Sequence, residues 1–336
     1  ELRLRLEPSL AAGLGEALDY VETYPFECIE QTISRFLPNV VTLQALDSLG
    51  IARADLAERL PRLAATSLQR LYAAQNLDGG WGWWAGQRSS PFITAYAVLG
   101  LAQARRADLA VDADVLARAT RYLKNWLNTT SRTPSPEERA FVLYALAEAG
   151  DGDLGRTVAL FDERHDLALY ARSLLASTLY ILQPEETDRL ETLANELSDA
   201  AILSATGVHW EEEIPHSRWM NTNVRTTAMV LRALLQVAPD SGLLPGAVRW
   251  LMTVRENARW STTQENVWSI LALTDYMVNT GELQAEYDYD LWLNGVLEAS
   301  EGVTAATVDV ATELEVPISA LHAEADNQVV IQRSAG

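Results

Sequence analysis

The chain has 336 residues, of which 48% are hydrophobic and 21% charged, a balance typical of a globular protein with a substantial core. Its formal net charge of −20 repels phosphate backbones and anionic lipid surfaces, so nucleic acid is not an expected partner. No apolar run reaches the roughly eighteen residues of a membrane span, and the lone Cys28 excludes an internal disulfide and a multi-cysteine zinc site. No metal or cofactor is expected.

The first residues predict a strand. Residues 1–7 alternate strictly between polar and apolar side chains, the period of a half-buried strand, and residues 327–333 are predicted to form another strand near the other end. We therefore expect residues 1–9 to be a strand of a flanking β domain, and the chain to be a piece of a longer protein. No signal-peptide pattern is present, so a targeting signal would lie outside the sequence.

A helix start follows at residues 24–40. Pro25 breaks any preceding helix, and the apolar spacing from Ile33 to Val40 starts a new one, with Cys28 and Gln31 in its first turn. Residues three apart on a helix lie on one face with Cβ atoms about 5–6 Å apart. The Cys28 and Gln31 side chains are long enough to close that gap.

From Leu10 to about Thr280 the apolar pattern is helical almost throughout. Alanine-rich segments recur at intervals of roughly 30 to 55 residues, which suits repeated helical hairpins with a buried inner layer. More polar helices, residues 112–128 and 185–203, lie between them. These patterns predict a mainly α protein with an α/α toroid (an α6/α6-type barrel) of about a dozen helices over residues 10–283, although the uneven spacing leaves ring closure open. The alanine-rich segments are residues 94–104, 139–149, 171–181, 225–235 and 264–274.

Several helix ends are marked by local signals. Thr262 and Glu265 have the spacing of a capping box. Pro91 and Pro136 are suited to the first turn of a helix. Left-handed residues just past helix ends are expected at Gly50, Gly150 and Gly281.

After Gly281 the pattern changes to strands. Residues 285–293 alternate and are followed by Asn294-Gly295, a strong hairpin signal, and residues 307–317 alternate again. We therefore expect residues 284–336 to be a β-rich segment, the truncated part of a flanking CUB-like or macroglobulin-type domain. The opening strand is expected to belong with it.

The motif around Cys28 resembles that of a known family. Residues 24–38 follow the pattern Tyr-Pro-x-x-Cys-x-Glu-Gln-Thr-x-Ser-Arg-x-x-Pro, which is similar to the thioester motif of bacterial alpha-2-macroglobulins within the alpha-2-macroglobulin and complement superfamily. Residues 75–84, 94–97 and 260–268 also resemble segments of those thioester domains. A bare Cys-x-Glu-Gln is a weak signal, whereas a register of fifteen residues is specific.

The resemblance implies a covalent trap, not an enzyme. In the family the cysteine sulfur attacks the glutamine amide, ammonia leaves and a thioester closes, here between Cys28 and Gln31. A lysine amine or a hydroxyl then attacks the acyl carbon and is captured. By the same resemblance, the captured partners are proteases, the parent chain carries other macroglobulin domains and a bait region, and the location is the periplasm or the cell surface.

Other residues of the motif region have two interpretations each. Tyr24 and Pro25 support the motif, and Glu30 either complements the helix N-terminus or helps to form or protect the thioester. A tryptophan segment further along could supply core or loop anchors, or an aromatic wall that keeps water from the thioester. Its residues are Trp81, Trp83 and Trp84.

No histidine is assigned to the site. Complement-type members use a histidine to steer the thioester toward hydroxyls, but none lies in residues 139–149, where a loose comparison would place it. His209 and His216 flank residues 210–215, which predict a solvated loop. We therefore expect direct attack by amines. The histidines considered are His165, His209, His216 and His322.

Two other classes of protein compete with this interpretation. Residues 75–82 also resemble the Gln/Trp motifs of triterpene cyclases, which share the α/α-barrel architecture, so an α/α-barrel enzyme of the terpene cyclase or prenyltransferase type is the main alternative. A cyclase needs an acidic cluster such as Asp-x-Asp-Asp, but Asp112-Ala-Asp114 is followed by Val115. A zinc prenyltransferase needs an Asp-Cys-His set that Cys28 lacks. A passive helical scaffold is the third possibility, and intact mass separates all three.

Overall fold

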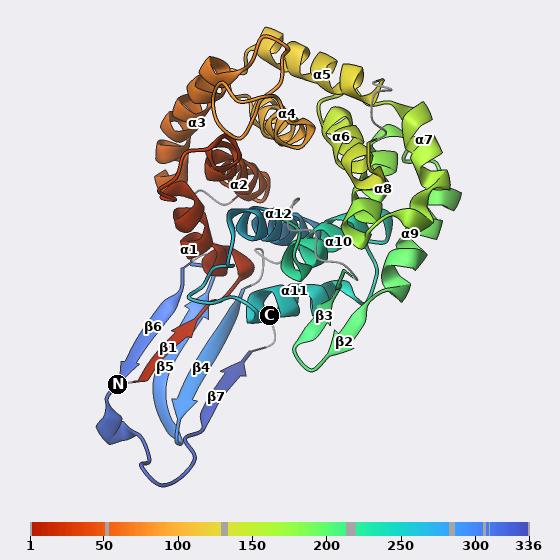
Figure 1. The fold of residues 1–336 in the computed structure, drawn as a ribbon. Helices are drawn as coiled ribbons and strands as arrows, with labels where there is room; N and C mark the ends of the chain where they lie inside the picture. The colour runs from red at the N-terminus through yellow and green to blue at the C-terminus, as the bar shows by residue number, and fades with distance from the viewer. Residues whose placement is uncertain are drawn as a thin grey trace.

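A computed structural model shows a ring of helices with strands from both ends of the chain beside it (Figure 1). Among the described residues there are twelve α-helices, and none combines the length and apolarity needed to cross a bilayer. The described residues are 2–50, 54–128, 134–212, 220–281, 286–304, 307–308 and 310–334.

Inner and outer helices alternate along the chain, and contacts between successive inner helices, including α12 with α2, close the ring. This confirms the predicted α/α toroid and adds the closure that the repeat spacing left open. The inner helices are α2 (Ile29–Ser48), α4 (Pro91–Arg106), α6 (Pro136–Glu148), α8 (Leu169–Leu182), α10 (Asn223–Val237) and α12 (Thr263–Thr280). The outer helices are α1 (Leu10–Glu22), α3 (Ala54–Ala74), α5 (Ala113–Leu127), α7 (Leu154–Asp162), α9 (Thr187–Asp199) and α11 (Leu244–Thr253).

The five alanine-rich segments all lie in inner helices, as their composition predicted. In α4 every residue from Phe92 to Ala104 is buried, whereas outer α5 buries one face only. Small residues let the inner helices approach closely. At Gly100, a Cβ atom would lie 2.8 Å from Ile33 Cγ2, so the contact between α2 and α4 requires glycine there.

Because an outer helix returns the chain between successive inner helices, all six inner helices run in the same direction. At one end of the ring, Glu30 near the start of α2 contacts Thr263 and Gln264 at the start of α12. At the other end, Gln103 of α4 donates to Glu148 of α6 at 3.1 Å. The loops that lead into the inner helices, including the one before Cys28, therefore share one mouth of the ring.

Most of the predicted helix ends are observed. Thr262 and Glu265 form a capping box, and Pro91 and Pro136 begin their helices. One prediction was too long: α9 ends at Asp199, because Ile202–Ser204 (β2) forms a short hairpin with Gly207–His209 (β3). The three glycines expected to be left-handed have φ of +76°, +77° and +65°, at Gly50, Gly150 and Gly281.

The strands near the two ends of the chain pair with each other. β1 (Leu2–Leu6) lies antiparallel to β6 (Thr312–Val316), so the opening strand does belong with the C-terminal strands, as predicted. β4 (Tyr287–Leu293) is central between β5 (Val296–Val303) and β7 (Val329–Arg333).

The predicted hairpin turn is present between β4 and β5, with positive φ at both Asn294 and Gly295. The strand predicted for residues 307–317 is shorter than expected, because Thr307 N–H donates to the carbonyl of Thr304 in a turn. The predicted boundary at 283/284 lies outside the described residues, and the division into domains stays a prediction.

Candidate functional site

Cys28 and Gln31 form the start of α2. Cys28 is the N-cap residue, with extended backbone (φ −66°, ψ 168°), after a connection from α1 that includes Pro25. Its sulfur accepts a hydrogen bond from Gln31 N–H at 3.5 Å, and Gln31 Oε1 accepts one from Cys28 N–H at 3.1 Å. This is a reciprocal capping box in which sulfur replaces the usual hydroxyl. The two side chains predicted to meet are therefore folded against each other's backbone.

The capping box also has a chemical consequence. The Cys28 N–H that donates to Gln31 Oε1 polarises the carboxamide carbonyl, and the positive end of the helix dipole acts in the same direction. Both effects stabilise negative charge that develops on that oxygen when a nucleophile adds to the carbonyl carbon. This geometry would favour addition of a nucleophile to the Gln31 carboxamide carbon.

Cys28 is largely shielded from solvent, with 6% of its surface exposed, whereas Gln31 is half-buried. Burial raises the pKa of the Cys28 thiol, and hydrogen bonds from the backbone of Gln31 and Glu30 oppose that rise. A free thiol here would therefore stay protonated and poorly accessible at neutral pH.

The tryptophan segment touches the helix start through one residue. Ile29 N–H donates to the carbonyl of Trp83 at 2.9 Å, and the Trp83 ring packs near Phe92 of α4. Trp81 is fully buried and donates its indole N–H to the carbonyl of Leu71, so it anchors α3 in the core. Trp84 is 50% exposed. The three residues thus have different environments, and Trp83 is the one whose backbone bonds to the start of α2.

The loop before Cys28 is held by residues that sequence reasoning did not assign. Arg35 of α2 donates to the carbonyl of Tyr24 at 2.9 Å, and Arg70 of α3 pairs with Glu27 at 2.8 Å. The Tyr24 ring lies edge-on to Tyr20 at 5.4 Å. Arg35 lies within the matched motif, but no local pattern indicates that Arg70, 43 residues after Glu27, would reach it.

Glu30 points into the ring. Only 1% of its surface is exposed, and its carboxylate accepts hydrogen bonds from Ser34, Thr263 and Gln264, with Gln264 Nε2 at 2.7 Å. Ser34 also lies 3.0 Å from the hydroxyl of Tyr96 of α4. Glu30 therefore links the start of α2 to the start of α12, and it is more than a surface charge that complements the helix N-terminus.

Burial raises the pKa of Glu30 above its ordinary value. Its protonated form is thus favoured by folding, and its contribution to stability declines as pH rises from about 4.3, the ordinary pKa of glutamate, through the raised folded pKa. We expect Glu30→Gln, which stays neutral, to lack this decline. Each unit by which the pKa is raised adds about 1.4 kcal/mol to the difference between the variants.

Urea unfolding of both proteins from pH 4 upward measures that difference. Other titrating groups contribute equally to the unfolding free energies of the parent chain and of Glu30→Gln, so their contributions cancel in the difference. Parallel curves of unfolding free energy against pH would therefore contradict the expectation. Glu265→Gln at the N-terminus of α12 is a matched control, because it neutralises a carboxylate that caps the neighbouring helix and leaves the hydrogen bonds of Glu30 in place.

None of the described histidines is shown to act at the helix start. His209 stacks on Trp250 at 4.7 Å, His165 and His322 are exposed, and His216 lies outside the described residues. The predicted solvated loop after His209 is wrong for two residues. Trp210 is fully buried and donates its indole N–H to the carbonyl of Leu197, and Glu212 caps α8 by accepting from Leu169 N–H and Tyr170 N–H. These contacts come from distant segments and have no local signature.

Comparisons with known proteins show what this chain is similar to. Residues 9–131 match the A-macroglobulin TED domain. Alpha-2-macroglobulin of Thermotoga maritima is 26% identical over 275 residues, which are 82% of this chain and 15% of that protein. A crystal structure of Salmonella alpha-2-macroglobulin reacted with methylamine has a TM-score of 0.67 and 20% identity, over 93% of this chain and 20% of that chain. A drimenyl diphosphate synthase of Streptomyces showdoensis is 36% identical over 104 residues, 30% of this chain and 20% of that enzyme.

This chain thus spans a fifth or less of the length of each of these proteins. At 20% identity the Salmonella structure shows the fold, a helical toroid. The sequence matches add similarity to alpha-2-macroglobulin thioester domains, which for the family model extends over residues 9–131. The matched residues 9–131 contain both Cys28 and Gln31. Together these matches support a likeness of this chain to a thioester domain of the alpha-2-macroglobulin superfamily.

Proposed function

We propose that Cys28 and Gln31 form an internal thioester that captures attacking proteins covalently. The sulfur of Cys28 adds to the carboxamide carbon of Gln31, the C–N bond breaks, and ammonia leaves with the proton of the thiol. The product is an acyl group of Gln31 linked to Sγ of Cys28. The observation that carries this proposal is the reciprocal capping box, which folds the carboxamide of Gln31 back over Cys28.

The capture step uses the bond that the first step made. A neutral amine of a lysine attacks the acyl carbon, the C–S bond breaks, and the sulfur leaves and takes up the proton that the amine loses. Gln31 then carries an amide to the captured protein. Gln31 N–H, which donates to Sγ, supports the departing sulfur, and Cys28 N–H supports the oxygen that becomes negative. Each site reacts once.

The surrounding residues receive positioning roles in this proposal. Tyr24 and Pro25 shape the loop that delivers Cys28 to the N-cap position, and Glu30 holds the first turn of α2 against α12. The proposed shield against water is Trp83, and the hydrogen bond from Ile29 N–H to its carbonyl supports this assignment. Trp81 supports that segment from the core.

At the level of a longer chain, the family suggests a protease-trapping inhibitor. Because the chain spans 15% of its Thermotoga relative, other macroglobulin domains of one polypeptide are the expected neighbours. We assign residues 1–9 and 284–336 to such flanking β domains, of macroglobulin or CUB type, and residues 10–283 to the thioester domain. Captured proteases are the proposed partners, and the periplasm or cell surface is the proposed location.

Methylamine tests the proposal directly. The Salmonella relative has been crystallised after reaction with this reagent. We expect this chain, as isolated, to be lighter by one ammonia than its sequence, and methylamine to release one thiol while adding one methylamine at Gln31. Intact mass, peptide mapping and thiol titration measure these changes. A chain of full sequence mass whose thiol titrates before any amine is added would refute the proposal, and a Glu at position 31 would indicate hydrolysis.

The enzyme alternative has one comparison in its favour, the partial match to the drimenyl diphosphate synthase. The acidic pair considered for it has another role here: Asp112 is the N-cap of outer helix α5 and accepts from Asp114 N–H and Val115 N–H at the exposed end of that helix. Incubation with a prenyl diphosphate, followed by analysis for a cyclised prenyl diphosphate of unchanged mass, would detect this activity.

A further inference from the structure

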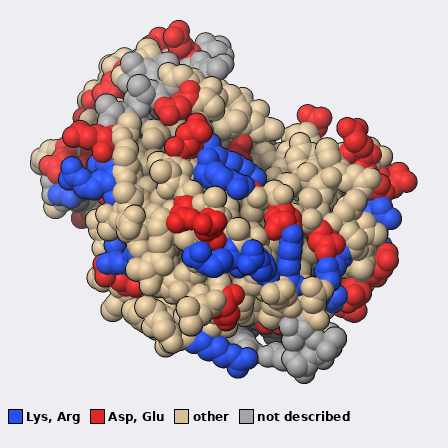
Figure 2. Space-filling model, turned by 90° about the horizontal axis from the view of Figure 1, so that it is seen from above, with Lys and Arg blue, Asp and Glu red and all other residues tan. Residues whose placement is uncertain are grey.

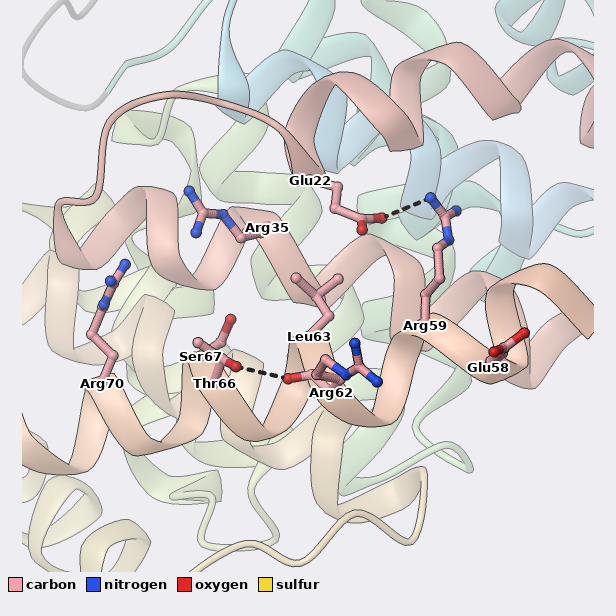
Figure 3. A pocket seen from close by; sticks show the side chains of 9 residues that line it. All are labelled: Glu22, Arg35, Glu58, Arg59, Arg62, Leu63, Thr66, Ser67 and Arg70. Atoms are coloured by element: carbon pink, nitrogen blue, oxygen red, sulfur yellow. Dashed lines mark hydrogen bonds and ion pairs between the residues drawn. The ribbon is translucent and has the colours of Figure 1, made fainter.

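A groove lined by arginines runs beside the loop that precedes Cys28. Its volume is about 370 Å³, and it lies between the end of α1, one side of α2 and the length of α3 (Figure 3). Arg35 and Arg70 lie at one end of the groove, and Arg59 and Arg62 lie toward the other (Figure 3). The chain has a net charge of −20, but the four arginines and two glutamates that line this groove give it a net positive charge.

The α3 arginines follow one face of the helix. Positions 59, 62 and 70 are separated by three and eight residues, close to whole turns, so they share a side. Over eleven residues the helix rises about 16 Å, a distance that about five residues of extended peptide span. Among the described residues no carboxylate pairs with Arg62, which is exposed, whereas Arg59 pairs with Asp19 and Glu22.

The chain itself shows what these arginines bind. The carboxylate of Glu27 lies 2.8 Å from Arg70 and 3.6 Å from Arg35, and its side chain remains half exposed. Arg35 also holds the carbonyl of Tyr24. A carboxylate on the loop residue next to Cys28 therefore pairs with two arginines that line the groove and joins the loop to both α2 and α3.

We propose that this groove binds a partner polypeptide segment that carries carboxylates, and that the segment displaces Glu27 from Arg70 and Arg35. Arginine and carboxylate pair in a planar, bidentate geometry that suits side chains presented one at a time. Glu22 and Glu58 also line the groove, which favours carboxylates on flexible side chains that can turn away from them over the fixed phosphates of a nucleic-acid backbone. On the face shown in Figure 2, basic side chains likewise stand in small groups among acidic ones.

Displacement of Glu27 has a consequence at the capping box. The loop at residues 23–27 loses its anchor to α3, and the backbone that places Cys28 at the N-cap position becomes freer to move. Occupancy of the groove thus regulates how readily the Cys28–Gln31 bond is attacked. This consequence rests on the proposed function, whereas binding of the acidic segment does not.

Binding is tested with fluorescein-labelled hexaglutamate and fluorescence anisotropy at low salt. Arg62→Gln and Arg70→Gln should each weaken binding by about threefold to tenfold, and Glu27→Gln should tighten it because the internal competitor is lost. Arg121→Gln on α5 and Glu298→Gln on β5 remove the same charges from exposed sites elsewhere and should have little effect. Equal effects of groove and control variants would overturn the proposal, as would tighter binding of a short single-stranded DNA.

Coupling is tested by amide hydrogen exchange, which does not need a thioester. Saturating hexaglutamate should speed exchange of amides in residues 23–28 in the parent chain, and it should speed methylamine-induced thiol release. Unchanged exchange in residues 23–28 at saturation would overturn the coupling. If exchange responds but no thiol is ever released by methylamine, the groove mechanism stands and the proposed thioester fails.

Discussion

Cys28→Ser should eliminate release of a thiol by methylamine and incorporation of a fluorescent primary amine, with no residual reaction above background. A serine hydroxyl at neutral pH does not displace ammonia from a carboxamide, so no activated acyl group would form. The fold should survive, because serine is a favoured N-cap residue and its Oγ can accept from Gln31 N–H as Sγ does. Intact mass shows whether methylamine has reacted, and fluorescence of the denatured chain shows whether the labelled amine is attached. Urea unfolding measures the stability of the fold.

Two further variants control for this result. Cys28→Ala removes the cap as well, and should cost about 1 kcal/mol of stability beyond the loss of reactivity. Gln31→Glu keeps an oxygen at the acceptor position but offers a carboxylate, which does not condense with the thiol unaided. It should leave Cys28 as a slowly titrating thiol. Amine incorporation that persists in Cys28→Ser would mean that another residue is the electrophile.

Trp81→Ala should have the largest effect on stability of any change in the tryptophan segment, about 3–5 kcal/mol. Its indole ring is fully buried, and its N–H satisfies the carbonyl of Leu71 at 2.8 Å. Truncation leaves a cavity and removes that hydrogen bond. Trp84→Ala, at a half-exposed position, should change stability by about 0.5 kcal/mol or less.

The same variants distinguish a tryptophan that stabilises the core from one that keeps water away from the proposed thioester. Urea unfolding gives the free energies, and the rate of spontaneous thiol release in buffer reports access of water to the thioester. We expect Trp83→Ala to raise that rate more than Trp84→Ala does, since the Trp83 carbonyl accepts from Ile29 N–H at the start of α2. Faster thiol release in Trp84→Ala alone would indicate that Trp84, and not Trp83, keeps water from the proposed thioester.

The parts of the structure that were predictable depend on short-range geometry. Pro25, the spacing of Cys28 and Gln31, and the Thr262–Glu265 capping box act within one helical turn, and each appears where it was expected. Inner helices were recognisable because burial on all sides selects small apolar residues, as from Phe92 to Ala104. The association of β1 with the C-terminal strands was expected from the alternation in both segments, whereas its partner, β6, was not predicted.

The parts that were missed depend on contacts between distant residues. Glu30 bonds to Thr263 and Gln264, more than 230 residues later, once the ring has closed. Trp210 is buried although acidic residues follow it, because α9 supplies the acceptor for its indole N–H. The different environments of Trp81 and Trp84 could not be predicted, because a loop has no regular hydrophobic periodicity that indicates which side chains are buried.

The capping box has a further consequence for what remains after the site has reacted. In the proposed reaction, the two atoms that cap the helix, the sulfur of Cys28 and the carbonyl oxygen of Gln31, would be present before closure, in the thioester and in the adduct. The reaction exchanges only the third substituent on the carbonyl carbon. The helix start therefore keeps its acceptors throughout, and a spent domain can retain its fold. A captured protein would remain tethered to a rigid body for as long as the amide bond lasts.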